Sequence, residues 1–194
     1  INQKPTSSKD PYALRRSALG LVKLLIENNK EFKIKDLINY SISLHRDQGF
    51  ELSNEALPKE LRDFLIERLK YYMKEKEIRT DIIDASINSY DLSHMNKIYK
   101  KASTLNKVIN KQIGKDIISS YRRAASILVS ELKDKELQLS NTSDSGIFKN
   151  DYEKNLLKKI NELRKYFTGV NKDENYAESL AHLAEAKKVI FEFF

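Results

Sequence analysis

The sequence predicts an all-α protein, a helical bundle of about eight helices in two packed subdomains, and three observations indicate this. Only 5 Gly and 3 Pro occur in 194 residues, which favours long helices over a turn-rich β protein. Apolar residues recur at helical spacing along the chain, and no convincing alternating strand pattern occurs. Charged residues make up 32% and hydrophobic residues 40%, a composition typical of a folded, helix-rich chain.

The first half of the chain is expected to form four helices. Asp10 offers an N-cap oxygen and Pro11 suits a first helical turn, so the first helix begins there and stops near "ENNK". A second helix covers about residues 34–46, and a loop follows. Pro58 opens a third helix with strong apolar periodicity. Thr80 or Asp81 then caps a short helix.

The second half is expected to form four more helices. The first runs from about Leu92 to Gln112, and Gly114 breaks the pattern before the next helix, over about 115–132. Residues 138–146 are rich in Ser, Asn and Asp and predict a loop. The last two helices cover about 150–167 and 174–194. We place a domain boundary near residue 95, which divides the chain into 1–95 and 96–194.

Most of the excess positive charge lies in one segment. The formal net charge is +7. Between residues 97 and 123 eight basic residues oppose one acid, Asp116. The basic residues are Lys97, Lys100, Lys101, Lys107, Lys111, Lys115, Arg122 and Arg123. Such a segment suits a polyanion, although a solvated lysine face on a helix explains the charge equally well.

The composition excludes several classes of protein. The chain has no cysteine, so disulfides and thiolate metal sites are excluded, which is compatible with a cytoplasmic location. No run reaches the roughly 18 apolar residues of a membrane span, and no signal peptide is visible. Because four of the last five residues are bulky and apolar, we expect a piece of a longer protein.

The sequence offers no candidate catalytic or metal-ligating residue. His45, His94 and His182 fall on separate predicted segments, and none has a histidine four residues on. The "HRD" tripeptide at 45–47 resembles a kinase catalytic loop, but the glycine-rich loop and "DFG" are missing. No phosphate-binding glycine motif or nucleophile elbow occurs. The carboxylates alternate with lysines, as on solvated helix faces.

Two N-terminal stretches carry a family resemblance. The stretch "PTSSKDPYALRRSALGLVKLL" resembles a segment of the β subunit of the bacterial two-subunit glycyl-tRNA synthetase, which typically reads T-G-S-K-D-P-F-A-L-R-R-A-A-L-G. The stretch "FLIERLKYYMKEKEIRTDIIDA" is similar to that family's F-x-x-x-R-L-x-x-Y-x-x-x-x-G-x-x-x-D-x-I-D-A. Here Glu77 stands where glycine is common.

Two further stretches continue the resemblance. "YRRAASIL" resembles the K-R-V-x-N-I-L of the family's DALR-type anticodon-binding domain, with Ala124 and Ser126 departing from Val and Asn. The closing "EAKKVIFEFF" resembles a helix that usually reads P-V-D-x-F-F, where Val189 and Phe191 replace Pro and Asp. The resemblance covers nearly the whole chain in order.

The resemblance implies the C-terminal part of the β subunit, namely the end of an HD-like helical region and most of the anticodon-binding domain. It implies a part of an ATP-dependent ligase of protein biosynthesis, in which the α subunit holds the active site with its ATP and Mg²⁺. This part then has no cofactor of its own. The implied partners are glycine tRNA and the α subunit, in an α₂β₂ parent.

Residues of the basic segment are the tRNA-contact candidates. Proteins read single-stranded loops by stacking aromatic or Arg side chains on bases, while lysines bind phosphates. Lys100, Lys101, Lys107 and Lys111 are the phosphate candidates, and Tyr121, Arg122 and Arg123 are the loop candidates.

Alternatives stay open for several of these side chains. Tyr121 has core spacing with Ile117, Ala124 and Leu128, which favours burial. One of Arg122 and Arg123 is expected to face solvent. Arg15 and Arg16 are candidates for either a tRNA-backbone contact or a contact with a neighbouring domain.

Two rival functions remain at this stage. One is a purely structural helical domain for subunit assembly, with solvated lysines. The other is a stand-alone enzyme of HD-phosphohydrolase type, which requires a His-Asp metal cluster that this sequence does not contain.

Overall fold

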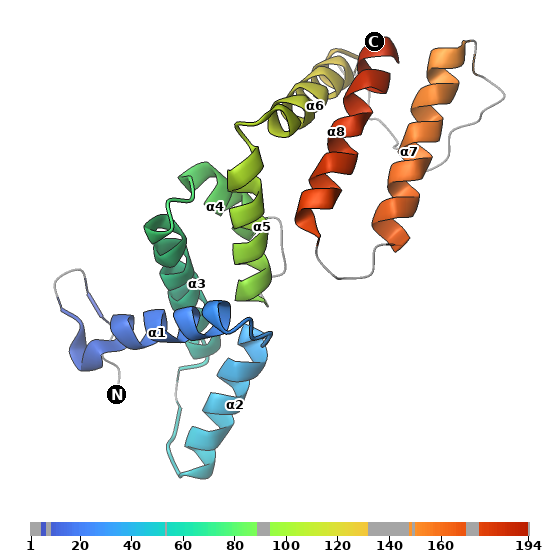
Figure 1. The fold of residues 1–194 in the computed structure, drawn as a ribbon. Helices are drawn as coiled ribbons and strands as arrows, with labels where there is room; N and C mark the ends of the chain where they lie inside the picture. Colours follow the sequence, from blue (N-terminus) through green and yellow to red (C-terminus); the bar gives the residue numbers. More distant parts are fainter. Residues whose placement is uncertain are drawn as a thin grey trace. The chain divides into compact units, whose positions relative to one another are not determined.

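The computed structural model describes residues 5–6, 9–52, 54–88, 94–131, 148, 150–169 and 175–193. Within these residues eight α-helices and one short 3₁₀ turn make up the regular structure, and no strand occurs, so the all-α class is confirmed (Figure 1). The chain divides into two compact units, Ile1–Asn106 and Lys107–Phe194. The proposed division near residue 95 concerns family domains and stays a prediction.

The first helix begins later than its sequence suggests. Pro11–Ala13 form a 3₁₀ turn in which Tyr12 and Ala13 have positive φ angles of 61° and 54°, and α1 spans Leu14–Glu27. The Asp10 carboxylate accepts a hydrogen bond from the backbone N–H of Arg15 at 3.1 Å. Asp10 therefore does satisfy a donor of the first turn, but across a left-handed turn rather than as an adjacent N-cap.

Three helices of the first unit end in the same way. α1, α2 (Ile34–Asp47) and α3 (Leu57–Glu75) are each followed by a residue with a positive φ angle. These residues are Asn29 (52°), Gly49 (82°) and Glu77 (58°). After α3 the N–H of Glu77 bonds to the Lys74 carbonyl at 2.9 Å and the N–H of Ile78 to the Met73 carbonyl at 3.1 Å. This is the Schellman motif, which satisfies the last carbonyls of a helix.

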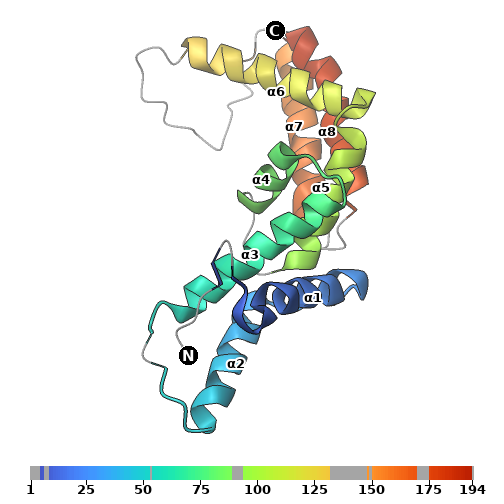
Figure 2. The same cartoon turned by 90° about the vertical axis from the view of Figure 1, so that its left-hand side faces the viewer.

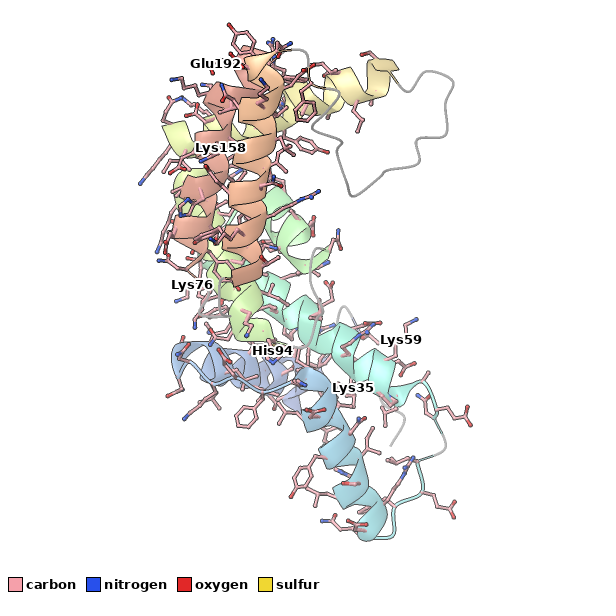
Figure 3. All side chains as sticks on the ribbon, turned by 90° about the vertical axis from the view of Figure 1, so that its right-hand side faces the viewer. Lys35, Lys59, Lys76, His94, Lys158 and Glu192 are labelled. Atoms are coloured by element: carbon pink, nitrogen blue, oxygen red, sulfur yellow. The ribbon has the colours of Figure 1, made fainter. Side chains whose placement is uncertain are left out.

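The core of the first unit forms where α1 and α2 pack on α3, and Figures 1 and 2 both show α1 lying across α3. α4 (Thr80–Asn88) also contacts α3, and α5 (Met95–Val108) follows His94, which Figure 3 marks. Fully buried apolar side chains among the described residues include Val22, Ile34, Leu69, Met73, Ile83, Met95, Ile98 and Ala102. Of the residues that give α3 its apolar periodicity, Leu69 and Tyr72 are buried, whereas Leu61, Phe64 and Leu65 are half-buried.

Two polar contacts cross this core. The hydroxyl of Tyr72 donates to the Glu27 carboxylate at 3.4 Å, and the Tyr72 and Tyr99 rings lie 5.5 Å apart. Burial raises the pKa of Tyr72 to about 12. The side-chain amide of Asn96 donates to the Asn29 side-chain oxygen at 2.7 Å. A buried polar group needs such a partner, so these bonds fix α1 against α3 and α5.

The second unit contains α6 (Gln112–Glu131), α7 (Asp151–Gly169) and α8 (Tyr176–Phe193). α8 packs against both other helices and therefore lies between them. Asn150 and Asn175 cap α7 and α8 by accepting from the N–H groups of Glu153 and Glu178 at 3.0 and 3.2 Å. Both helix starts agree with the expected positions to within two residues. The predicted loop at 138–146 lies outside the described residues.

The break between the two helices expected at Gly114 occurs before this glycine rather than at it. α5 ends at Val108 and α6 begins at Gln112, so Gly114 lies in the first turn of α6. A Cβ at Gly114 would lie 2.5 Å from the Val108 carbonyl oxygen and from the Cα of Ile109. Glycine is required here because the backbone of the preceding turn occupies the space of a side chain.

Exchanging Glu77 for glycine should stabilise the chain. A left-handed backbone costs a non-glycine residue roughly 1–2 kcal/mol, partly offset by the greater chain entropy of glycine, so we expect Glu77→Gly to raise the free energy of unfolding by about 0.5–1 kcal/mol. Urea denaturation measures the change. Lys74→Gly, in the last turn of α3, is the control and should lower the free energy of unfolding by about 0.5–1 kcal/mol. Destabilisation by Glu77→Gly would contradict the assigned turn.

Alanine at Gly114 and at Gly20 should have opposite effects on the melting temperature. Gly114→Ala forces the preceding turn to move, and overpacking of this kind costs about 1–3 kcal/mol. Gly20 lies within α1, and a Cβ there meets nothing within 4 Å. Gly20→Ala should therefore stabilise the chain by roughly 0.5–1 kcal/mol. Equal melting temperatures for the two variants would contradict the close approach at Gly114.

Candidate nucleic-acid interface

The lysines of α5 lie on the side of the helix turned away from its buried residues. Spacings of three and four residues place Lys97, Lys100 and Lys101 on one face, whereas Ile98 and Ala102 are fully buried. Lys100 and Lys101 are half-buried, and burial lowers the pKa of Lys101. This face of α5 forms a strip of positive charge in the first unit.

Lys107 and Lys111 belong to the second unit and are exposed. Lys107 lies in the last turn of α5, and Lys111 lies in the short connection before α6, where its N–H donates to the Val108 carbonyl at 2.9 Å. The phosphate candidates are thus divided between the two units, with Lys100 and Lys101 in the first.

Two of the loop candidates, Tyr121 and Arg122, are exposed on α6. Tyr121 is 72% exposed, so the expectation that it is buried is wrong. Helical spacing defines an apolar stripe, but α8 covers another sector of α6, which contains Asp116 and Arg123. Arg122 is turned about 100° from Arg123 around the helix axis. The expectation that one of these two arginines faces solvent is confirmed.

Arg123 is half-buried against α8. Its guanidinium carbon lies 4.7 Å from the centre of the Phe191 ring, within the range of a cation–π interaction. The Arg123 Nε is buried without a hydrogen-bond partner in the described structure. Its candidate contact with tRNA stays a prediction, and its contact in the folded chain is with α8.

The acid of the basic segment is neutralised within the same contact. Lys187 on α8 donates to Asp116 at 2.7 Å, and the side-chain amide of Gln112 donates to the same oxygen at 2.6 Å. Lys187 also lies 5.8 Å from the Phe191 ring centre. These bonds hold the pKa of Asp116 below its usual range, with Lys187 the main cause. We call Asp116, Arg123, Lys187 and Phe191 the α6–α8 latch.

The paired arginines near the N-terminus have different environments. Arg15 is half-buried, and its guanidinium donates to the Thr6 carbonyl. Arg16 is exposed on α1. Arg15 therefore helps to hold the N-terminal turn, while Arg16 presents its charge to solvent. Whether either contacts tRNA or a neighbouring domain stays a prediction.

The histidines lie apart in the described structure. His45 contacts the Ser41 carbonyl through Nδ1 at 2.8 Å on α2, and the His182 ring lies 4.1 Å from that of Tyr166 at the α7–α8 contact. Among the described residues no group of three or more His, Asp or Glu side chains could hold a metal ion. None of the described helices is long and apolar enough to cross a membrane.

Sequence reasoning missed the α8 half of the latch. In the sequence Phe191 stands out only as a departure from a family pattern, and no motif marks Lys187. One signal was available, because Asp116 is the single acid within residues 97–123 and lies in a helix that needs a packing partner. That signal indicates that Asp116 has a cationic partner but does not identify it.

In comparisons with known proteins, both a family model and individual relatives show that the chain is similar to glycyl-tRNA synthetase beta subunits. The family model of the glycyl-tRNA synthetase beta subunit matches residues 1–88. The glycine–tRNA ligase beta subunit of Rickettsia canadensis (strain McKiel) is 30% identical over 203 residues, which covers 99% of this chain and 27% of that protein. That of Rickettsia africae (strain ESF-5) is 28% identical over 200 residues, with 99% and 26% covered.

A third relative is the glycine–tRNA ligase beta subunit of Cereibacter sphaeroides (strain ATCC 17029 / ATH 2.4.9), which is 28% identical over 195 residues. The aligned region covers 100% of this chain and 28% of that protein. The chain thus spans about a quarter of the length of the curated relatives it matches. These similarities support the relation to the beta-subunit family that the sequence motifs indicated.

Replacing Asp116 by asparagine should destabilise the chain in a pH-dependent way. Because Lys187 lowers the pKa of Asp116 from its ordinary 3.8, the ionised carboxylate stabilises the folded chain above about pH 4, and this contribution disappears as the pH falls through the folded-state pKa. We expect Asp116→Asn to unfold at lower urea concentration than the unchanged chain at pH 7, and we expect this difference to shrink as the pH falls below the ordinary aspartate range toward the lowered pKa of Asp116.

The matched control is Asp84→Asn, which removes an exposed carboxylate 3.9 Å from Lys70. Its effect at pH 7 should be smaller, because an exposed, long ion pair contributes little. A loss in Asp116→Asn that is independent of pH would show that the pair with Lys187 is not its cause.

Proposed function

We propose that this chain is the tRNA-binding part of a glycine–tRNA ligase beta subunit and that it contacts the anticodon region of glycine tRNA. The observation that carries this proposal is the similarity to beta subunits named glycine–tRNA ligase along 99% of the chain. The exposed side chains of Lys107, Lys111, Tyr121 and Arg122 in the second unit support it, because an RNA loop offers phosphates and unstacked bases.

The lysines bind the sugar–phosphate backbone. Lys107 and Lys111 are exposed, and Lys100 is half-buried. A lysine ammonium binds phosphate as a point charge and carries no base information. These residues therefore set the affinity and its dependence on salt.

The outer face of α6 contacts the loop itself. Tyr121 and Arg122 are adjacent in sequence and both are exposed, so one can stack on a base while the other bonds to a base edge or a phosphate. Between Gln112 and Ser130 the sequence has one acid, Asp116, and Lys187 neutralises it. This face of α6 therefore meets RNA without a competing negative charge.

The latch gives this face its orientation. Phe191 and Lys187 hold Arg123 and Asp116 against α8, which leaves the opposite side of α6 open to solvent. A rigid platform reduces the entropy lost when RNA binds. Arg123 thus acts on tRNA through the position of α6, in addition to any direct contact.

The remaining roles follow the parent enzyme. The partner is the α subunit, which holds the ATP, the Mg²⁺ and the site of glycine attachment, within a cytoplasmic α₂β₂ assembly. The present chain contributes tRNA binding to that reaction.

Subunit assembly is the second candidate function. Leu24 on α1 is 62% exposed, and Leu21 on the same face is partly exposed. An exposed apolar helix face is the kind of surface that a partner protein buries in an assembly. On this alternative the lysines are simply solvated, and glycine tRNA does not bind this chain.

Substitutions on the outer face of α6 should weaken the binding of a glycine tRNA transcript. Tyr121→Ala removes a stacking ring worth about 1–3 kcal/mol, so we expect Kd to rise by about 5- to 150-fold. Arg122→Gln should lower the salt slope of log K by about one. Fluorescence anisotropy of labelled tRNA from 50 to 200 mM salt measures both.

Two controls match these changes in chemistry and exposure. Tyr40→Ala removes a ring that is 65% exposed on α2, and Lys188→Gln removes a charge that is 83% exposed on α8. Both should leave tRNA binding unchanged. If Tyr121→Ala and Arg122→Gln bind tRNA like the unchanged chain while Leu24→Ser abolishes the association with the α subunit, the assembly function replaces the one proposed.

A further inference from the structure

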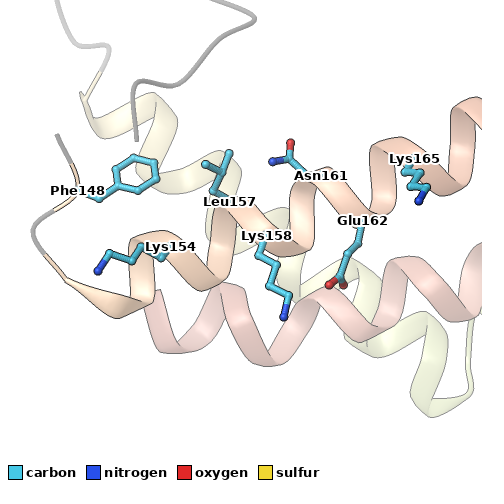
Figure 4. A pocket seen from close by; sticks show the side chains of 7 residues that line it. All are labelled: Phe148, Lys154, Leu157, Lys158, Asn161, Glu162 and Lys165. Atoms are coloured by element: carbon cyan, nitrogen blue, oxygen red, sulfur yellow. The ribbon is translucent and has the colours of Figure 1, made fainter. Parts of the chain in front are cut away.

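We infer that the outer face of α7 is a second RNA-binding groove, separate from the outer face of α6, which holds a single RNA strand by its phosphates and stacks one base. This inference rests on the proposed function for the presence of RNA, but on different residues. The groove has a volume of about 550 Å³ and is lined by Phe148, Lys154, Leu157, Lys158, Asn161, Glu162 and Lys165 (Figure 4).

The spacing of the polar residues places them along one line of α7. Lys154, Lys158, Asn161 and Lys165 follow at intervals of four, three and four residues, which is one face of a helix. At about 1.5 Å per residue this line is about 16 Å long, enough for several nucleotides. Lys154, Lys158 and Lys165 are exposed, and Figure 3 marks Lys158 on α7.

The opposite face of α7 is already occupied by α8. Lys159 pairs with Glu185 at 2.8 Å, and the Tyr166 ring lies against His182. Lys159 also lies 3.8 Å from Glu162, which draws the one acid of the groove lining toward the α8 side. The pair between Lys154 and Asp151, at 3.3 Å, is exposed and weak, so it does not compete with a phosphate.

The chemistry of the lining favours RNA over an acidic protein segment. Lys158 and Lys165 supply two point charges for phosphates, and the Asn161 amide both donates to and accepts from a base edge. The rings and alkyl groups of Phe148 and Leu157 line the same groove and offer a surface for one base. An acidic peptide would bind only to the lysines and would not use the apolar surface of Phe148 and Leu157 or the amide of Asn161.

The test compares three variants of the chain with two labelled probes, a glycine tRNA transcript and a 12-nucleotide oligoadenylate. The affinity of the unchanged chain should rise when the salt concentration falls from 200 to 50 mM. In the double variant Lys158→Gln with Lys165→Gln this rise should be about 7- to 12-fold smaller, because each phosphate contact changes log K by about 0.7–0.9 for every tenfold change in salt and the variant loses two contacts. The control Lys188→Gln should keep the full gain, and Tyr121→Ala reports on α6. Circular dichroism checks that each variant is folded.

The outcomes separate this groove from the α6 face. A reduced salt slope in the α7 double variant with either probe supports the groove, even if Tyr121→Ala has no effect. An unchanged slope in the folded double variant overturns it, even if Tyr121→Ala weakens binding. If the unchanged chain binds neither probe, both proposals fail. Binding of the same double variant to the α subunit is measured as well, and its loss with unchanged RNA binding assigns the face to a protein partner and overturns the groove.

Discussion

The packing of α8 between α6 and α7 is the constraint on which the surface of the second unit depends. On one side Lys187 and Phe191 engage Asp116 and Arg123 of α6. On the other side Glu185 pairs with Lys159, and His182 lies against Tyr166 of α7. Because α8 occupies the inner face of both helices, their remaining cationic and aromatic side chains point to solvent. Both proposed RNA contacts follow from this arrangement.

The contacts of α8 also determine which charges are available. The carboxylates of Asp116 and Glu185 each have a lysine partner from a neighbouring helix, and these lysines lower the pKa of both acids. A carboxylate that is paired in this way contributes little repulsion toward a phosphate. The lysines and arginines that remain outside these pairs can therefore contribute to the binding of a polyanion.

The first unit depends on the ends of its helices as much as on its core. Three Schellman motifs end α1, α2 and α3, and each requires one left-handed residue. Gly49 adopts this conformation without strain, whereas Asn29 and Glu77 adopt it at a cost. The buried side chains around Leu69, Met73 and Ile98 offset that cost, because each large apolar side chain contributes about 1.5–3 kcal/mol on burial.

The sequence by itself determined the all-α class, most helix positions and the concentration of positive charge between residues 97 and 123. These follow from local spacing, capping residues and composition, which do not depend on distant contacts. The sequence also indicated backbone constraints at two positions. Gly114 breaks the helical periodicity, and Glu77 stands where the family pattern commonly has glycine.

Only the tertiary structure decided which side of each helix meets another. Tyr121 shares its spacing with core residues and yet is exposed, because the direction from which α8 approaches α6 is not written in the periodicity of α6. The same holds for Arg123 and Phe191, which lie far apart in sequence and meet through a cation–π contact. The left-handed turn at Tyr12 and Ala13 likewise places the start of α1 later than the sequence predicts. The Asp10 carboxylate accepts from the N–H of Arg15 rather than from a donor next to Pro11. Helical spacing identifies a stripe, whereas the partner that covers it depends on long-range packing.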